Sequence, residues 1–117
     1  MQTTTPTKYL EFVLLPSFER SVAGLFTEED VRALEQTLLA NPRAGDVVQG
    51  TGGVRKVRAA QEGRGKRGSA RVVYLFVEVR ERIYLLWAFG KNDQANLTPE
   101  QVKRVRQLVE TLKSGEG

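Results

Sequence analysis

The stretch that decides the fold is residues 70–90, ARVVYLFVEVRERIYLLWAFG. Residues 70–79 and 83–90 are rich in β-branched and aromatic side chains, and both segments predict β-strands. Because only RER at 80–82 separates them, the two strands should form a hairpin. Both strands are apolar on both faces, which favours a place at the centre of a sheet over a place at its edge.

Helical patterns lie on both sides of this hairpin. Residues 17–25 and 28–40 predict two helices, the second with Thr27 as its N-cap and an Asn-Pro stop at 41–42. Thr-Pro-Glu-Gln at 98–101 is a capping box with proline at the first helical position. It predicts a C-terminal helix.

Two more strands complete the fold. Residues 8–15 and 54–60 predict strands, and the glycine-rich residues 43–53 predict a loop. The order β-α-α-β-β-β-α predicts an α+β fold, a small antiparallel sheet with two N-terminal helices and a C-terminal helix packed on it. The length of 117 residues fits a single domain over residues 1–117.

Positive charge is concentrated in one short part of the chain. The net charge is +4, yet residues 54–71 hold seven lysines and arginines against one acid, and the remainder holds eleven cations against thirteen acids. A basic patch on a slightly acidic body is typical of a protein that binds a phosphate-bearing partner. The alternative is a solvated charged loop with no partner.

The composition excludes several kinds of chemistry. Cysteine and histidine are both absent, so thiolate chemistry and the commonest metal ligand are excluded. We expect no metal and no cofactor, since Glu62 and Asp93 belong to no ligand cluster. The N-terminus has no secretory pattern, and no stretch approaches the ~20 apolar residues of a membrane span. A cytoplasmic protein without a membrane partner is therefore expected.

Gly63, Gly65 and Gly68 spell G-x-G-x-x-G, a pattern found in dinucleotide-binding turns. In such a turn a helix follows the glycines and its N-terminus meets the pyrophosphate. Here a predicted strand follows them, and Lys66 is followed by Arg67 rather than the Ser or Thr of a Walker A loop. We therefore interpret this segment as a cationic loop that binds phosphates.

Three cations are expected to meet next to that loop. Lys56 and Arg58 alternate along one predicted strand and share a face, and Arg71 begins the next strand. If these two strands pair, the three side chains converge on one surface of the sheet. Like charges placed together favour an anion, so the sequence predicts a phosphate-binding site.

Three segments carry a resemblance to a known family. GTGGVRKVR at 50–58, GRGKRGSARVVYLFV at 63–77 and IYLLWAFGKNDQANLTPEQ at 83–101 resemble the HigB branch of the RelE/ParE toxins of bacterial toxin–antitoxin systems. Residues 18–53 are similar to the two-helix N-terminal part of these toxins. The resemblance covers nearly the whole chain in the same order.

The resemblance implies a metal-independent endoribonuclease that cuts messenger RNA in the decoding site of the 30S ribosomal subunit. The ribose 2′-hydroxyl attacks the neighbouring phosphate and leaves a cyclic phosphate and a 5′-hydroxyl. It also implies a cognate antitoxin, HigA-like and carrying a helix-turn-helix domain. Basic family positions match Lys56, Arg58 and Arg71, and a polar or basic position after the last strand matches Lys91 and Asn92.

Roles for these residues follow from the charges and the resemblance together. Arg58 and Arg71 are expected to clamp the scissile phosphate, while Arg64, Lys66 and Arg67 bind the backbone of RNA or ribosome. Lys56 is either the general base, since neighbouring cations disfavour its charged form, or a further phosphate ligand. Arg55 faces the opposite side of its strand and is expected to be structural.

The aromatic residues are expected to be structural. The chain lacks the C-terminal tyrosine or histidine that relatives often use as an acid or base, and Tyr9, Tyr74 and Tyr84 are predicted to lie on strands in the core. Trp87 and Phe89 follow Leu85 at period 2, which favours the core over a base-stacking role. Two other functions stay open: a non-catalytic RNA- or ribosome-binding module, and a ParE-like toxin that poisons DNA gyrase.

Overall fold

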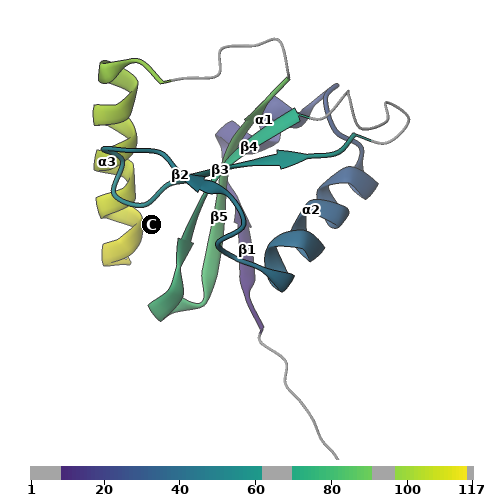
Figure 1. Cartoon of the computed structure of the whole chain (residues 1–117), viewed down its shortest axis with the longest axis horizontal. Helices are drawn as coiled ribbons and strands as arrows, with labels where there is room; N and C mark the ends of the chain where they lie inside the picture. Colours follow the sequence, from purple (N-terminus) through teal and green to yellow (C-terminus); the bar gives the residue numbers. More distant parts are fainter. Residues whose placement is uncertain (1–8, 62–69, 91–96, 116–117) are drawn as a thin grey trace, which may run out of the picture.

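The computed structural model describes residues 9–61, 70–90 and 97–115. A five-stranded sheet lies between helix α3 on one face and helices α1 and α2 on the other (Figure 1). The helices are α1 (Pro16–Val22), α2 (Glu28–Ala40) and α3 (Pro99–Ser114). The strands are β1 (Glu11–Leu14), β2 (Asp46–Val47), β3 (Arg55–Ala59), β4 (Ala70–Val77) and β5 (Arg82–Phe89).

The predicted α+β fold is confirmed, and so is the central position of the β4–β5 hairpin. The strand order is β1-β5-β4-β3-β2, with β4 and β5 paired antiparallel in the middle. A short 3₁₀ turn (Glu78–Arg80) joins them, and Glu81 takes the left-handed conformation there. The pairing of β3 with β4 that the phosphate-site prediction required is also present.

The sheet differs from the prediction in two details. Strand β1 pairs with β5 in parallel, so the sheet is mixed rather than wholly antiparallel. A parallel neighbour needs a long crossover, and the chain between β1 and β5 supplies one. The predicted loop at 43–53 contains the strand β2, which pairs with the start of β3. Two residues are too few to show a strand periodicity in the sequence.

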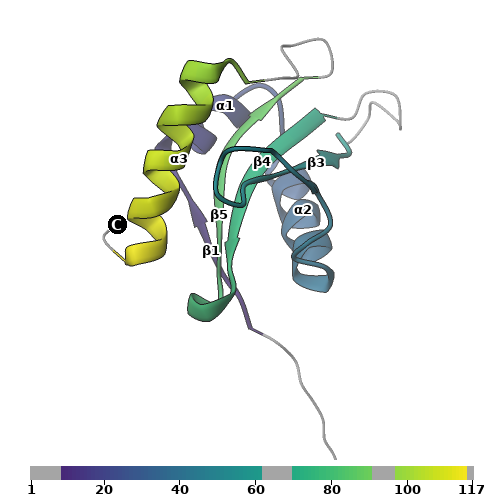
Figure 2. The ribbon, with the colours of Figure 1, turned by 60° about the vertical axis from the view of Figure 1, so that its left-hand side comes forward.

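Each face of the sheet has its own apolar core, because side chains alternate along β4. Val72 and Tyr74 point toward α1 and α2, where they pack with Phe18, Leu34 and Leu38. Val73, Leu75 and Val77 point toward α3 and pack with Val105, Val109 and Leu112. Figure 2 shows α3 lying alongside the sheet on the side away from α2.

The predicted helix starts are confirmed in detail. Thr27 and Asp30 bond each other's backbone at the start of α2, and Thr98 and Gln101 do the same at the start of α3. Each pair satisfies two backbone N–H groups that a helix leaves without an internal partner. These boxes fix the first turns of the two long helices that cover the sheet.

A β-bulge in β5 changes the face on which its last residues lie. Val73 pairs with Trp87 but Tyr74 pairs with Leu85, so Leu86 is an extra residue. Leu85 therefore packs on the α1 and α2 side, whereas Leu86 and Trp87 both face α3. The period-2 grouping of Trp87 and Phe89 with Leu85 was thus wrong, because a bulge shifts the alternation by one residue.

Hydrogen bonds of Tyr74 with Gly45 and Pro42, the Tyr74 lock, hold the loop before β3 against the strand on the α1 and α2 side. The buried Tyr74 hydroxyl accepts a hydrogen bond from Gly45 N at 3.0 Å and donates one to Pro42 O at 2.9 Å. A Cβ at Gly45 would lie 2.7 Å from Lys56 O, so only glycine fits against β3 there. Burial raises the pKa of the Tyr74 hydroxyl, which keeps it neutral and able to donate.

The three tyrosines confirm the core prediction in two cases. Tyr74 and Tyr84 are buried, with 0% and 5% of their surfaces exposed. Tyr9 is 83% exposed and precedes β1, so its assignment to a core strand was wrong. The first strand starts later than predicted, which leaves Tyr9 outside the sheet.

Replacing Tyr74 by phenylalanine tests the lock. Tyr74→Phe removes one hydroxyl and leaves the Gly45 N–H and the Pro42 carbonyl without that partner, so we expect a loss of ~1–3 kcal/mol in the free energy of unfolding. Tyr84→Phe is the matched control, because its hydroxyl takes only a 3.4 Å contact from Arg82. Urea unfolding of both variants measures the difference. Equal stability of the two would contradict the lock.

Candidate functional site

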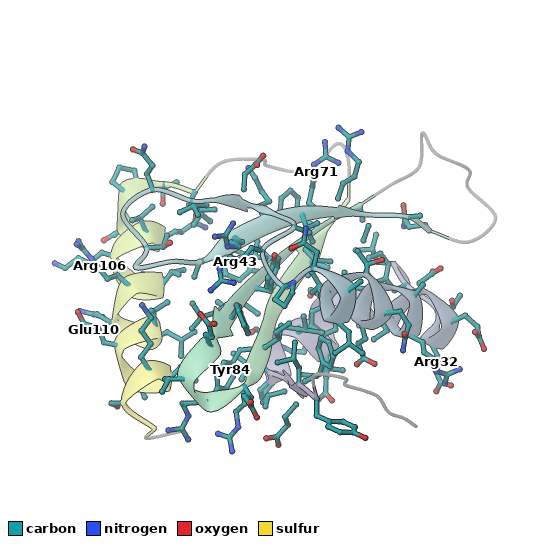
Figure 3. The ribbon with its side chains drawn as sticks, turned by 60° about the horizontal axis from the view of Figure 1, so that its bottom comes forward. Arg32, Arg43, Arg71, Tyr84, Arg106 and Glu110 are labelled. Atoms are coloured by element: carbon teal, nitrogen blue, oxygen red, sulfur yellow. The ribbon has the colours of Figure 1, made fainter. Side chains whose placement is uncertain are left out.

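The pairing of β3 with β4 brings Lys56, Arg58 and Arg71 onto one face of the sheet. Arg58 lies directly opposite Arg71, and Lys56 lies opposite Val73. Val57 and Ala59, which alternate with the two cations of β3, pack in the core on the α1 and α2 side. The three cations therefore share the α3 face, and Figure 3 shows Arg71 pointing outward from the sheet.

Acidic side chains do not neutralise the two arginines within the described part of the chain. The ion pairs found there are Arg32–Glu29, Arg43–Glu78 and Arg82–Glu11, none of which includes Arg58 or Arg71. Arg58 is exposed, and Lys56 and Arg71 are half-buried. Like charges directly opposite each other on a sheet are destabilising. This arrangement favours an anion that bridges the two guanidinium groups.

Arg55 on the same strand has a different environment. Its Nη1 donates to Gly45 O at 2.7 Å and to Arg43 O at 3.3 Å, on the face opposite Arg58. The predicted structural role of Arg55 is therefore confirmed. Strand β3 therefore separates its cations by face, with Arg55 bonded to the loop on one side and Lys56 and Arg58 on the other.

Aromatic side chains border the three cations, although the sequence favoured the core over a base-stacking role for them. Phe89 pairs with Arg71 and Trp87 with Val73, so both lie on the face of the cations. Both are half-buried and pack at the margin of the α3-side core. The core prediction for them holds in part only. The sequence carries no clear signal for the bulge that turns them to this face.

Several predicted residues lie outside the described residues, namely Arg64, Lys66, Arg67, Lys91 and Asn92, together with Gly63, Gly65, Gly68, Glu62 and Asp93. Among residues 9–61, 70–90 and 97–115, no group of three or more acids could hold a metal ion. None of the helices in this described part is long and apolar enough to cross a membrane.

Comparison with known proteins shows the family of the chain. A family model described as the RelE toxin of the RelE/RelB toxin–antitoxin system matches residues 31–116. The chain belongs to the RelE toxin family. The match includes all of α3, the three cations and the paired strands that carry them.

A solved structure of the same family shares the fold. The free state of the E. coli toxin RelE, in a form with two arginines replaced by alanine, matches with a TM-score of 0.56 and 17% sequence identity. The match covers 82% of this chain and 97% of the E. coli chain. Membership in the RelE family implies a toxin with a cognate antitoxin and supports a ribonuclease activity in general.

The repulsion between Arg58 and Arg71 can be measured as stability. Arg71→Gln removes one of two facing charges, so we expect the free energy of unfolding to stay constant or to rise by up to ~1 kcal/mol. Added salt should shrink the gain, because it screens the repulsion. The matched control is Arg55→Gln, which breaks the bonds to Gly45 O and Arg43 O and should cost ~1–2 kcal/mol.

Thermal and urea unfolding at low and high salt measure the change in the free energy of unfolding for Arg71→Gln and for Arg55→Gln. A loss of stability in Arg71→Gln as large as that in Arg55→Gln would show that Arg71 is a structural residue. The interpretation of the α3 face as an anion site would then fail.

Proposed function

We propose that this RelE-family toxin is a ribosome-dependent messenger RNA endoribonuclease of the HigB-like branch. The observation that carries the proposal is the convergence of Lys56, Arg58 and Arg71 on one face of the sheet. The face combines cations with half-buried aromatic residues, as expected of a surface that binds unstacked RNA. The resemblance of residues 50–58 and 63–77 to HigB toxins supports the choice of branch.

The proposed reaction is an internal transesterification that uses protein cations in place of a metal ion. The ribose 2′-hydroxyl attacks the adjacent phosphorus, the bond to the 5′-oxygen of the next nucleotide breaks, and a cyclic phosphate and a 5′-hydroxyl result. Negative charge grows on the phosphate oxygens during the attack. Arg58 and Arg71 lie side by side on one face of the paired strands, so both can bind those oxygens. Removal of one such preorganised donor typically costs ~3 kcal/mol of activation free energy.

Proton transfer is assigned to Lys56 or to groups outside the protein. Lys56 lies two residue pairs from the two arginines on the same face, within reach of a bound phosphate. In its neutral form it would accept the 2′-hydroxyl proton, and in its charged form it would add a third phosphate ligand. The chain has no histidine to take this role. Orientation of the 2′-hydroxyl in line with the leaving oxygen supplies further acceleration.

The partners follow from the same proposal. The toxin would act in the cytoplasm, in the decoding site of the 30S subunit, on messenger RNA. Arg64, Lys66, Arg67, Lys91 and Asn92 are proposed to contact the RNA or ribosomal backbone. The antitoxin, proposed to be HigA-like with a helix-turn-helix domain, would cover this face or block its access to the ribosome.

Two alternative functions would affect RNA and DNA in the cell differently from a nuclease. A non-catalytic RNA- or ribosome-binding module would leave messages intact, and a ParE-like gyrase poison would produce DNA breaks and an SOS response. Sequencing of RNA 5′-hydroxyl ends in cells that express the toxin separates the three. Cuts that follow the reading frame of translated messages support the nuclease. The facing pair Arg58 and Arg71 favours it over the other two.

Arg71 gives the sharpest test of the proposed chemistry. Arg71→Ala should lower message cleavage by about a hundredfold or more while the protein stays folded, because it removes a charged ligand of the transition state. Arg71→Lys should recover only part of the activity, since a point charge cannot replace the two-pronged guanidinium. Growth arrest and cleavage rate are measured together, with thermal melts as the folding control. Wild-type cleavage by a folded Arg71→Ala protein would remove Arg71 from the site.

Ribosome binding should depend strongly on salt. Residues 54–71 carry seven cations, and about six phosphate contacts would lower affinity by ~10³-fold between about 50 and 200 mM salt on duplex-type estimates. Arg71→Gln should reduce the slope of log affinity against log salt by about one. Sedimentation of the toxin with ribosomes measures both. An affinity that is constant over this range would contradict binding through the basic segment.

A further inference from the structure

The bulge in β5 places Trp87 in a pocket between β5 and α3, on the same face of the sheet as the three cations. It turns Trp87 toward α3, where Trp87, Leu97, Gln101, Arg104 and Val105 line a hollow of about 240 Å³. With strict alternation and no bulge, Trp87 would face α1 and α2 as Leu85 does. Bulges are over-represented next to active sites, where they re-aim a side chain.

The lining of this pocket has the chemistry of a nucleobase site. Trp87 gives a flat aromatic surface, and Leu97 and Val105 give aliphatic walls. Gln101 Oε1 accepts the N–H of Thr98 at 2.8 Å, an arrangement that leaves the Gln101 amide nitrogen as a donor. Arg104 is exposed at the rim and adds a cation. Stacking on aromatic rings with hydrogen bonds to the base edge is the usual way proteins hold unstacked RNA bases.

The pocket lies no farther from the three cations than the length of one or two nucleotides. Two rows of paired residues cross β3, β4 and β5 on the α3 face. One row consists of Lys56, Val73 and Trp87, and the other consists of Arg58, Arg71 and Phe89. Neighbouring strands are about 4.8 Å apart, so Trp87 is about 10 Å from Lys56 across the sheet. A phosphate bound by Arg58 and Arg71 would therefore bring an adjacent base to Trp87.

We propose that the pocket between Trp87 and the first half of α3 holds one RNA base next to the scissile phosphate. Trp87 acts as the stacking platform, while Gln101 and Arg104 contact the edge of the base or its phosphate. The proposal rests on the nuclease function above and adds a residue that positions the RNA for cleavage. In this way the toxin holds a base on the same face on which it cleaves the chain.

The chain offers a direct measurement, because Trp87 is its single tryptophan. A base stacked on an indole ring quenches its fluorescence, so emission from the wild-type protein reports only on this pocket. The probe is a short 2′-O-methyl oligoribonucleotide, which binds but has no 2′-hydroxyl for cleavage. The control probe is an abasic oligomer of the same length and charge. We expect the 2′-O-methyl oligomer to quench the fluorescence of Trp87. The abasic oligomer should bind, as the anisotropy of a label at its end would show, but it should not quench the fluorescence.

Two arginines of α3 form a matched pair for this titration. Arg104→Ala should raise the concentration for half-maximal quenching by about tenfold, the value of one charge-assisted hydrogen bond. Arg106→Ala should change it far less, because Arg106 is exposed on the outer side of α3 and does not line the pocket (Figure 3). Both substitutions remove the same charge from the same helix.

Cleavage assays on translating ribosomes give an independent readout. Trp87→Phe keeps a stacking ring and should retain most activity, whereas Trp87→Leu should lose about tenfold in kcat/KM, in the range of one base–aromatic stack. An abasic nucleotide at the stacked position should lower kcat/KM of the wild type about tenfold. It should lower kcat/KM of Trp87→Leu little further. Thermal melts monitor folding of both variants.

The two readouts keep the proposal separate from the nuclease function. The fluorescence titration requires no cleavage, so a base-specific quench supports the pocket even if messages stay intact. Trp87 fluorescence that is unchanged at the highest oligonucleotide concentration, or equal quenching by the abasic oligomer, would overturn the pocket. In that case cleavage that still depends on Arg71 would leave the nuclease function standing.

Discussion

The antiparallel register of β3 against β4 is the constraint on which the rest of the molecule depends. It places Arg58 directly opposite Arg71 and Lys56 two residue pairs away, all on the α3 face. A slip by one residue would turn Lys56 and Arg58 toward the core on the α1 and α2 side and Val57 toward the α3 face. The register therefore decides both whether the protein folds and whether its cations can meet a phosphate.

The opposite face of β3 fixes that register. Gly45 fits closely against Lys56 O, its N–H donates to Tyr74, and its carbonyl accepts from Arg55. Tyr74 lies opposite Arg55 on β4, so the lock ties both strands of the site to the same loop. The backbone that carries the cations is thus held in place by contacts on the other face of the strand. Such support positions a binding group without using its charge.

The fold can tolerate the facing charges because its stability comes from elsewhere. A like-charged pair across strands costs of order 0.2–1 kcal/mol. One buried Leu, Ile or Val contributes ~1.5–3 kcal/mol, and β4 and β5 are buried on both faces by the two cores. A local violation of the usual charge pairing in an otherwise consistent structure is typical of a functional site.

The sequence predicted those parts of the structure that depend on local chemistry. The caps at Thr27 and Thr98, the hairpin and the shared face of Lys56 and Arg58 follow from residue types and periodicity alone. The parallel pairing of β1, the strand β2 and the bulge at Leu86 depend on contacts between distant segments. For that reason the cationic part of the site was predictable and its aromatic part, with Trp87 in a pocket, was not.

The most direct test of the central claim is an NMR titration that follows the Nε–H signals of the arginine side chains. The probe is the 2′-O-methyl oligoribonucleotide, and Arg55, Arg58 and Arg71 are observed in one spectrum. We expect the Arg58 and Arg71 signals to shift together with one affinity, while Arg55 stays constant because its guanidinium is bonded to Gly45 O. Shifts confined to other arginines, such as Arg32 on α2, with Arg58 and Arg71 unchanged, would contradict the account.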